Sequence, residues 1–160
     1  MNPSIINLFR IAICLLLWTT AGAQTSPAFK KLDDKKCFKD IPFGTGYAEL
    51  EKKLGLKKGK QRFTGDYEIT NPKYLTTGIY IVGRGVAHFS LKNELESIDL
   101  YMDMEEGVEF NEVVRSFQLQ YGEFKELGDC MWWFGNQISF SVCYEDLKDE
   151  AKITYALKKK

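Results

Sequence analysis

Two apolar runs constrain the fold of this chain more than any other feature. Each run has a cysteine at the end that is farther from the other run. They lie between Cys130 and Cys143 and are separated by the Gly-Asn-Gln tripeptide at residues 135–137. Apolar, strand-like runs joined by a short turn that contains glycine and asparagine are typical of a β-hairpin. We therefore predict a hairpin over residues 130–143 whose open end can be closed by a disulfide.

The register of this hairpin decides whether the disulfide can form. If Gly135 and Asn136 make the loop, Cys130 and Cys143 are diagonal neighbours. If Asn136 and Gln137 make it, the cysteines lie directly opposite each other, at a separation that a disulfide can bridge. A three-residue loop would place them on opposite faces and forbid the bond. A disulfide here would stabilise the fold by roughly 3 kcal/mol in the chain-entropy model.

Both two-residue loops distribute the side chains over the two faces of the hairpin in the same way. The core face would carry Met131, Trp133, Ile138, Phe140 and Val142, and the other face Cys130, Trp132, Phe134, Ser139, Ser141 and Cys143. Two aromatic rings, each offering roughly 150–250 Å² beside small serines, are typical of a recognition surface. We therefore predict a binding surface of Trp132, Phe134, Ser139 and Ser141. The alternative is that segment 24–40 covers the rings.

The first 23 residues are typical of a secretory signal peptide. Arg10 is their only charged residue, residues 11–18 are apolar, and small residues precede a cleavage point after Ala23. The apolar run is well short of the ~20 residues that a membrane-spanning helix needs. A lipoprotein signal would need a small residue before Cys14, where the chain has Ile13. We expect a secreted or periplasmic protein with no stable membrane anchor after cleavage.

The length and charge of the chain limit its class. Removal of the signal peptide leaves 137 residues, enough for one domain. The whole chain has 22 basic and 22 acidic side chains, and the signal peptide contains one of the basic ones. The remaining chain therefore has a formal charge of −1, which predicts no nucleic-acid partner. Three cysteines remain, so one thiol is left over in an oxidising compartment. Local spacing favours the Cys130–Cys143 pair, although Cys37 could replace either partner.

The rest of the chain divides into a polar arm and one domain. Residues 24–40 are rich in lysine and have no apolar period, which predicts an arm. Residues 41–160 predict a single α+β domain. Apolar side chains at helical spacing predict helices at 47–54 and 109–121. Alternation and turn residues predict further strands at 78–82, 86–91, 95–102 and 151–157, with the first two paired through a turn at 83–85.

The two halves of this domain repeat the order of a helix, a hairpin and a strand. The spacing of Tyr47, Leu50 and Leu54 recurs at Phe110, Val113 and Phe117, and the alternation of Ile98, Leu100 and Met102 recurs at Ile153, Tyr155 and Leu157. We therefore predict an α+β fold in which a single antiparallel sheet carries two helices on one face, built from a duplicated helix–hairpin–strand unit.

Residues 41–55 read Ile-Pro-Phe-Gly-Thr-x-x-x-Glu-Leu-x-x-x-Leu-Gly. Behind a signal peptide, this phrase resembles small exported proteins of Bacteroidetes-type bacteria. The duplicated order of helix and strands is similar to that of β-lactamase inhibitory proteins and of small outer-membrane-assembly lipoproteins. The resemblance implies binding to a protein partner in the cell envelope or outside the cell, rather than catalysis. The chain lacks the lipidation cysteine of the lipoproteins, and no binding residue carries over from these families.

Residues that could perform catalysis are few. His88 is the only histidine, and its strand predicts a half-exposed surface position. Acidic residues from Asp99 to Glu112 fit a solvated helix start better than a calcium loop. We predict a non-catalytic binding module that acts through protein–protein contact at the aromatic sheet face, with no cofactor and no metal. The alternatives are a glycan or small-ligand binder, or a secreted hydrolase that uses Asp99 and Asp103.

Overall fold

The computed structural model describes residues 26–58, 65–104 and 109–158. The predicted signal peptide lies outside these residues. Within them the α-helices are α2 (Pro27–Lys35), α3 (Tyr47–Leu54) and α4 (Phe110–Tyr121), with one 3₁₀ turn, η1 (Pro72–Tyr74). No helix of the described ranges has the length and apolar character needed to cross a membrane.

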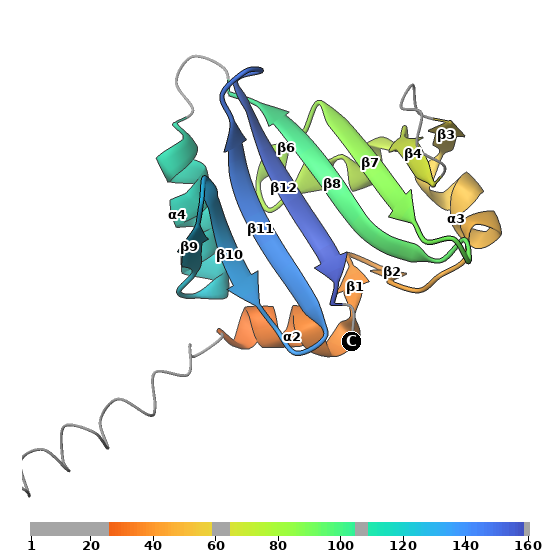
Figure 1. The fold of residues 1–160 in the computed structure, drawn as a ribbon, viewed down its shortest axis with the longest axis horizontal. Helices are drawn as coiled ribbons and strands as arrows, with labels where there is room; N and C mark the ends of the chain where they lie inside the picture. The colour runs from red at the N-terminus through yellow and green to blue at the C-terminus, as the bar shows by residue number, and fades with distance from the viewer. Residues whose placement is uncertain (1–25, 59–64, 105–108, 159–160) are drawn as a thin grey trace, which may run out of the picture.

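Eight strands form one antiparallel sheet (Figure 1). Their spatial order is β3 (Leu56–Lys58), β4 (Asp66–Ile69), β7 (Arg84–Phe89), β8 (Leu95–Asp103), β12 (Glu150–Leu157), β11 (Ile138–Glu145), β10 (Cys130–Phe134) and β9 (Lys125–Leu127). Two separate pairs are β1 (Cys37–Phe38) with β2 (Ile41–Pro42) and β5 (Thr76–Thr77) with β6 (Tyr80–Ile81). The α+β class is confirmed, with one helix and two small hairpins more than predicted.

The hairpin of β10 and β11 has the register that allows the disulfide. Cys130 pairs directly with Cys143, and the loop consists of Asn136 and Gln137. The two cysteines form a disulfide bond, which confirms the prediction. Cys37 is buried and is the free cysteine of the described chain. A structural disulfide suggests an oxidising, extracytoplasmic location.

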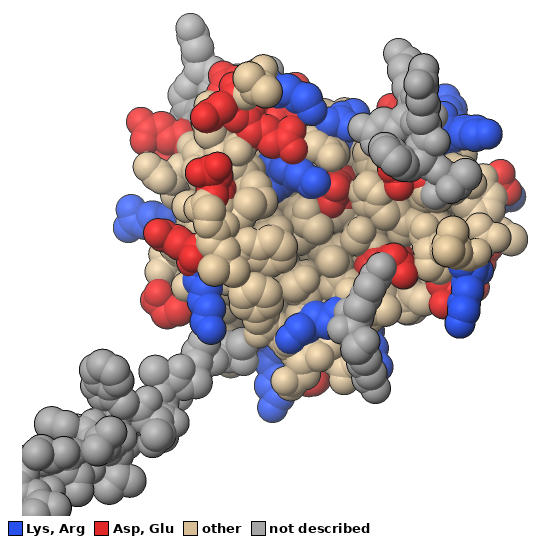
Figure 2. Space-filling model, viewed as in Figure 1, with Lys and Arg blue, Asp and Glu red and all other residues tan. Residues whose placement is uncertain are grey.

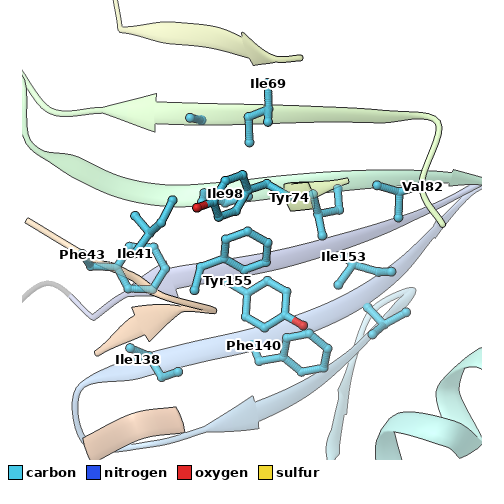
Figure 3. Packing of buried hydrophobic residues seen from close by; sticks show 14 of the residues in the cluster. Ile41, Phe43, Ile69, Tyr74, Val82, Ile98, Ile138, Phe140, Ile153 and Tyr155 are labelled. Atoms are coloured by element: carbon cyan, nitrogen blue, oxygen red, sulfur yellow. The ribbon is translucent and has the colours of Figure 1, made fainter. Parts of the chain in front are cut away.

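The core lies on one face of the main sheet, beneath the helices. α4 places Phe117 and Tyr121 against Phe140 of β11, with ring centroids 4.9 and 5.1 Å apart. Figure 3 shows Phe140 and Tyr155 side by side near the centre of this cluster, and their ring centroids are 4.8 Å apart. α3 contributes the fully buried Leu54. The apolar period of the two predicted helices therefore marks the faces that cover the sheet.

The segment predicted as a polar arm contains the helix α2. The hydroxyl of Ser26 caps it by accepting the N–H of Phe29 at 3.2 Å. Phe29 and Asp33 are the buried positions of the helix. The Phe29 ring packs on Tyr121, with centroids 5.7 Å apart, and the Asp33 carboxylate binds the loop of the β10–β11 hairpin. Phe29 and the partly buried Leu32 are its apolar contacts with the core, and the next buried position is the charged Asp33, so the segment shows no extended apolar period.

The prediction that segment 78–82 pairs with the next strand is wrong. β6 pairs with β5, and β7 begins within the predicted turn. Gly85 is a strand residue opposite Leu100. A Cβ at Gly85 would lie 2.8 Å from a side-chain carbon of Leu75, so the glycine makes room for Leu75 to pack on the strand. A glycine in a strand can mark such a close approach instead of a turn.

Candidate functional site

The second face of the main sheet is free of helices in the described part of the chain (Figure 1). We call it the open face, and its side chains include Trp132, Phe134, Ser139, Ser141, Lys152, Thr154, Asp99, Tyr101, Arg84, His88 and Asp66. Figure 2 views this face and shows uncharged side chains over its middle, with Lys, Arg, Asp and Glu gathered mainly toward its borders. An uncovered sheet face of this kind can contact a partner over several strands.

The predicted aromatic residues lie at one end of the open face. The rings of Trp132 and Phe134 are parallel within 3°, with centroids 5.5 Å apart, and we call them the aromatic pair. Phe134 is 39% exposed, whereas Trp132 and Ser139 are half-buried. Ser141 is buried and offers little surface to a partner. The described part of segment 24–40 leaves Phe134 exposed, because its helix packs at the hairpin loop and on the helix side.

The disulfide lies next to the aromatic pair on the same face. The facing pairs along the hairpin run from Cys130 with Cys143, through Trp132 with Ser141, to Phe134. The covalent bond therefore closes the end of the hairpin that is remote from the loop. The disulfide restricts both strands before a partner binds, so less conformational entropy is lost on binding. The strand that carries the aromatic pair is thus covalently linked to its neighbour, β11.

A polar network centred on Asp99 lies across the sheet from the aromatic pair. The carboxylate of Asp99 accepts the hydroxyl of Thr154 at 2.8 Å, the ammonium of Lys152 at 3.0 Å and His88 Nε2 at 3.1 Å. The Tyr101 hydroxyl approaches it at 3.5 Å. Burial opposes the charge on Asp99, but the hydrogen bond from His88 and the charge of Lys152 lower its pKa to about 2. Asp99 is therefore a buried anion with its own set of cations.

His88 lies between two carboxylates. Its Nδ1 is 2.8 Å from Asp66 Oδ1, and its Nε2 is 3.1 Å from Asp99 Oδ2. When both carboxylates are ionised they only accept hydrogen bonds, so both ring nitrogens then donate and the ring is an imidazolium. Partial burial opposes this charge, but the hydrogen bonds and charges of Asp99 and Asp66 outweigh it and raise the pKa of His88. A ring held in this way has no lone pair free to act as a general base.

The carboxylates of the hydrolase alternative do not form a pair. Asp99 is buried inside its network, while Asp103 is exposed at the end of β8. They are four positions apart on an extended strand, which puts their Cα atoms about 13 Å apart. Paired carboxylates in glycosidases are roughly 5–9.5 Å apart. The geometry therefore gives no support to glycoside hydrolysis at these two residues.

His88 and Asp99 were identifiable from the sequence, but the residues that join them into a network were not. Lys152 and Thr154 alternate with the apolar residues of β12, which is a signal for the open face. The pairing of β12 with β8, which brings them to Asp99, has no local signal because the two strands lie about fifty residues apart. Asp66 was likewise missed, because its pairing opposite His88 depends on β4 joining β7.

No protein-family model, curated protein or solved structure matches this chain. Within the described ranges, no group of three or more His, Cys, Asp or Glu side chains is arranged to hold a metal ion. The candidate site is therefore the open face itself, with the aromatic pair beside the disulfide at one end and the ionic network on β7, β8 and β12.

Proposed function

We propose that this protein is an exported, non-catalytic binding module that contacts another protein through the open face. The observation that carries the proposal is the aromatic pair, in which Trp132 and the 39% exposed Phe134 stack on a sheet face that no described helix covers. Tryptophan and other large aromatic side chains are enriched among the residues that dominate protein–protein binding energy. The disulfide beside them supports a rigid contact surface.

The dimensions of the open face favour a protein over a small ligand. Eight strands at the usual spacing are roughly 34 Å wide. A typical protein partner covers about 800 Å² on each side, whereas small molecules are usually enclosed in a concave pocket. Charged groups such as Arg84, which contacts the Tyr101 ring at 3.6 Å and pairs with Glu150 at 3.6 Å, would then lie toward the border of the contact and orient it.

The order of the sheet supports a duplicated origin, which we include in the proposal. The strands that follow α3 are ordered β3-β4-β7-β8, and those that follow α4 are ordered β9-β10-β11-β12 from the opposite edge. Two copies of a helix-and-four-strand unit, joined through β8 and β12, would produce this arrangement. The resemblance to β-lactamase inhibitory proteins is part of the same proposal and agrees with a protein partner.

A glycan is the second candidate ligand. The observation that favours it is the parallel orientation of the aromatic pair, with the half-buried Ser139 hydroxyl on the neighbouring strand. Parallel rings offer a flat apolar surface, and a nearby hydroxyl offers a hydrogen bond, which together match the two sides of a sugar ring.

The test compares the aromatic pair with an exposed apolar residue elsewhere. Immobilised wild-type protein, Trp132→Ala, Phe134→Ala and the control Leu147→Ala are exposed to envelope extract and to a glycan array. Leu147 is 101% exposed in the turn between β11 and β12, at the end of β11 that is remote from the hairpin loop. We expect a defined protein to bind to wild type and Leu147→Ala and to be lost with both aromatic variants.

Other outcomes of this comparison contradict the proposal. Glycan binding without a protein ligand would favour the second candidate. Equal loss of the protein with Leu147→Ala would show that the aromatic pair has no special role. Trp132→Ala should also leave the melting temperature nearly unchanged, and a large fall would show that Trp132 acts in the core instead of at an interface.

A further inference from the structure

Three large apolar side chains are almost fully exposed on the helix side of the molecule. Ile79, Ile81 and Leu119 have exposed fractions of 87%, 81% and 82%. Ile79 lies in the turn of the β5–β6 hairpin and Ile81 in β6. Tyr80, between the two isoleucines, contacts Phe117 of α4 with ring centroids 6.4 Å apart. The hairpin is therefore docked through Tyr80 while both isoleucines face outward.

One lysine, Lys39, contacts the hairpin that carries these isoleucines. The ammonium of Lys39 donates to Thr76 Oγ1 at 2.6 Å, and Thr76 is the residue that pairs with Ile81. Lys39 also lines a cleft of about 260 Å³ together with Lys31 and Lys35 of α2. Three lysines thus line this cleft, and one of them, Lys39, also contacts the hairpin.

The cleft and the hairpin form one continuous surface. Gln120 lines the cleft and follows Leu119 in α4. A Cβ placed on Gly78, next to Ile79, would lie 4.0 Å from Gln120 Oε1. We call this surface the basic–apolar patch, and it consists of Ile79, Ile81, Leu119, Lys31, Lys35 and Lys39.

The lysines of the basic–apolar patch have no carboxylate bound to them among the described residues. Neighbouring Lys73, in contrast, pairs with Asp40 at 3.3 Å. Asp33 of α2 is directed to the hairpin loop, and Asp34 does not line the cleft. Burial lowers the pKa of Lys39 even though Asp40 is nearby, so an external anion would stabilise its charged form.

We propose that the basic–apolar patch binds the surface of an anionic phospholipid membrane. Its isoleucines would enter the interfacial region while its lysines contact the headgroups, which is the combination that peripheral membrane proteins use. A membrane is favoured over an acidic protein because it satisfies the lysines and the outward-facing isoleucines at once. This inference does not depend on the proposed function. If both hold, the membrane-bound molecule turns its open face away from the lipid.

Vesicle co-sedimentation of the protein, purified after export, tests this inference. We expect binding to vesicles that contain phosphatidylglycerol, weak binding to phosphatidylcholine alone, and a decrease with added salt. The Ile79→Ser/Ile81→Ser variant should bind anionic vesicles about tenfold more weakly or worse. Lys31→Gln/Lys35→Gln should weaken binding roughly tenfold through the lost headgroup attraction.

Matched control variants replace exposed leucines or lysines that lie outside the basic–apolar patch. Leu91→Ser/Leu147→Ser changes leucines that are 98% and 101% exposed in the turns after β7 and β11, and Lys57→Gln/Lys125→Gln changes exposed strand lysines. Both controls should bind vesicles like wild type, and circular dichroism should show that every variant is folded. The inference is overturned if wild type does not sediment with anionic vesicles or binds both lipids equally. It is also overturned if the control variants lose as much binding as the patch variants.

Discussion

The carboxylate of Asp33 joins α2 to the hairpin that carries the aromatic pair, and its replacement by alanine should destabilise the fold. It accepts the backbone N–H groups of Asn136, Gln137 and Ile138 at 2.8, 2.7 and 2.9 Å. These partners lie 103 to 105 positions away in the chain. Asp33 is only 4% exposed, so the contact is a buried, charge-assisted attachment between distant segments.

The size of the effect follows from the burial of the three donors. A hydrogen bond to a charged group contributes about 1.5–3 kcal/mol, and a buried donor without a partner costs about 1–3 kcal/mol. Asn136 is exposed and Gln137 half-buried, so water can replace the carboxylate there, whereas the contact to Ile138 is buried. We therefore expect Asp33→Ala to lower the free energy of unfolding by about 2–4 kcal/mol, or the melting temperature by roughly 8–16 °C.

Urea unfolding followed by tryptophan fluorescence measures this loss. The matched control is Asp34→Ala, which changes the exposed neighbour and should stay within about 0.5 kcal/mol of wild type. Hydrogen exchange should show lost protection at residues 136–138 in Asp33→Ala alone. If Asp33→Ala and Asp34→Ala unfold at the same urea concentration, the carboxylate does not hold the loop and the reasoning is wrong.

The same carboxylate predicts a pH dependence. Burial opposes its charge, but the three N–H groups and the charge of Lys158 lower the pKa of Asp33 in the fold. A pKa that is lower in the folded than in the unfolded state gives stability that is present above the unfolded pKa of about 3.9 and is lost as pH falls through the folded pKa. The difference in stability between wild type and Asp33→Ala should therefore shrink below about pH 4.

The disulfide and the polar network carry the remaining predictions. Replacing Cys130 and Cys143 together by serine should lower the free energy of unfolding by about 3 kcal/mol, and reducing wild type should have the same effect in a urea titration. Because the pKa of His88 is raised by folding, its stabilisation is full below the unfolded pKa of about 6.5 and is lost as pH rises through the folded pKa. Wild type should therefore lose stability in that range while His88→Gln does not, and a flat wild-type profile would contradict the imidazolium. Asp99→Asn leaves Lys152 without its anion and should cost about 3 kcal/mol or more at neutral pH in thermal unfolding, whereas a loss below about 1 kcal/mol would show that the network is solvated. Because the pKa of Asp99 is lowered to about 2, its contribution in wild type should disappear as pH falls from about 4 toward 2.

The parts of the fold that were predictable are those with a local signal. α4 repeats apolar residues at helical spacing and ends before Gly122, and α3 ends before Gly55 in the same way. The β10–β11 hairpin has its turn residues and its alternation within fourteen positions, so its loop could be narrowed to two two-residue choices and one three-residue choice. Such signals act between neighbours along the chain and need no knowledge of the remaining structure.

The parts that were missed depend on contacts with distant segments. α2 is polar along most of its length, because Phe29 and the partly buried Leu32 supply its apolar contact with the core and the carboxylate of Asp33 binds the hairpin loop. Likewise, Gly85 has the composition of a turn, but the packing of Leu75 makes it a strand residue. The secondary-structure propensity and the apolar period of a segment reflect an average environment. A specific tertiary contact can therefore outweigh the structure that they predict.

The amino-acid sequence alone determined which side chains share a face of the hairpin, because alternation along a strand is a local property of the backbone. It thereby placed Trp132 and Phe134 beside a possible disulfide. Only the tertiary structure decided that this face stays uncovered by the described helices, and that His88, Asp99 and Lys152 meet on it. Those outcomes depend on how β7, β8 and β12 pair, and strand pairing across long separations is set by the packing of the whole core, not by any one segment.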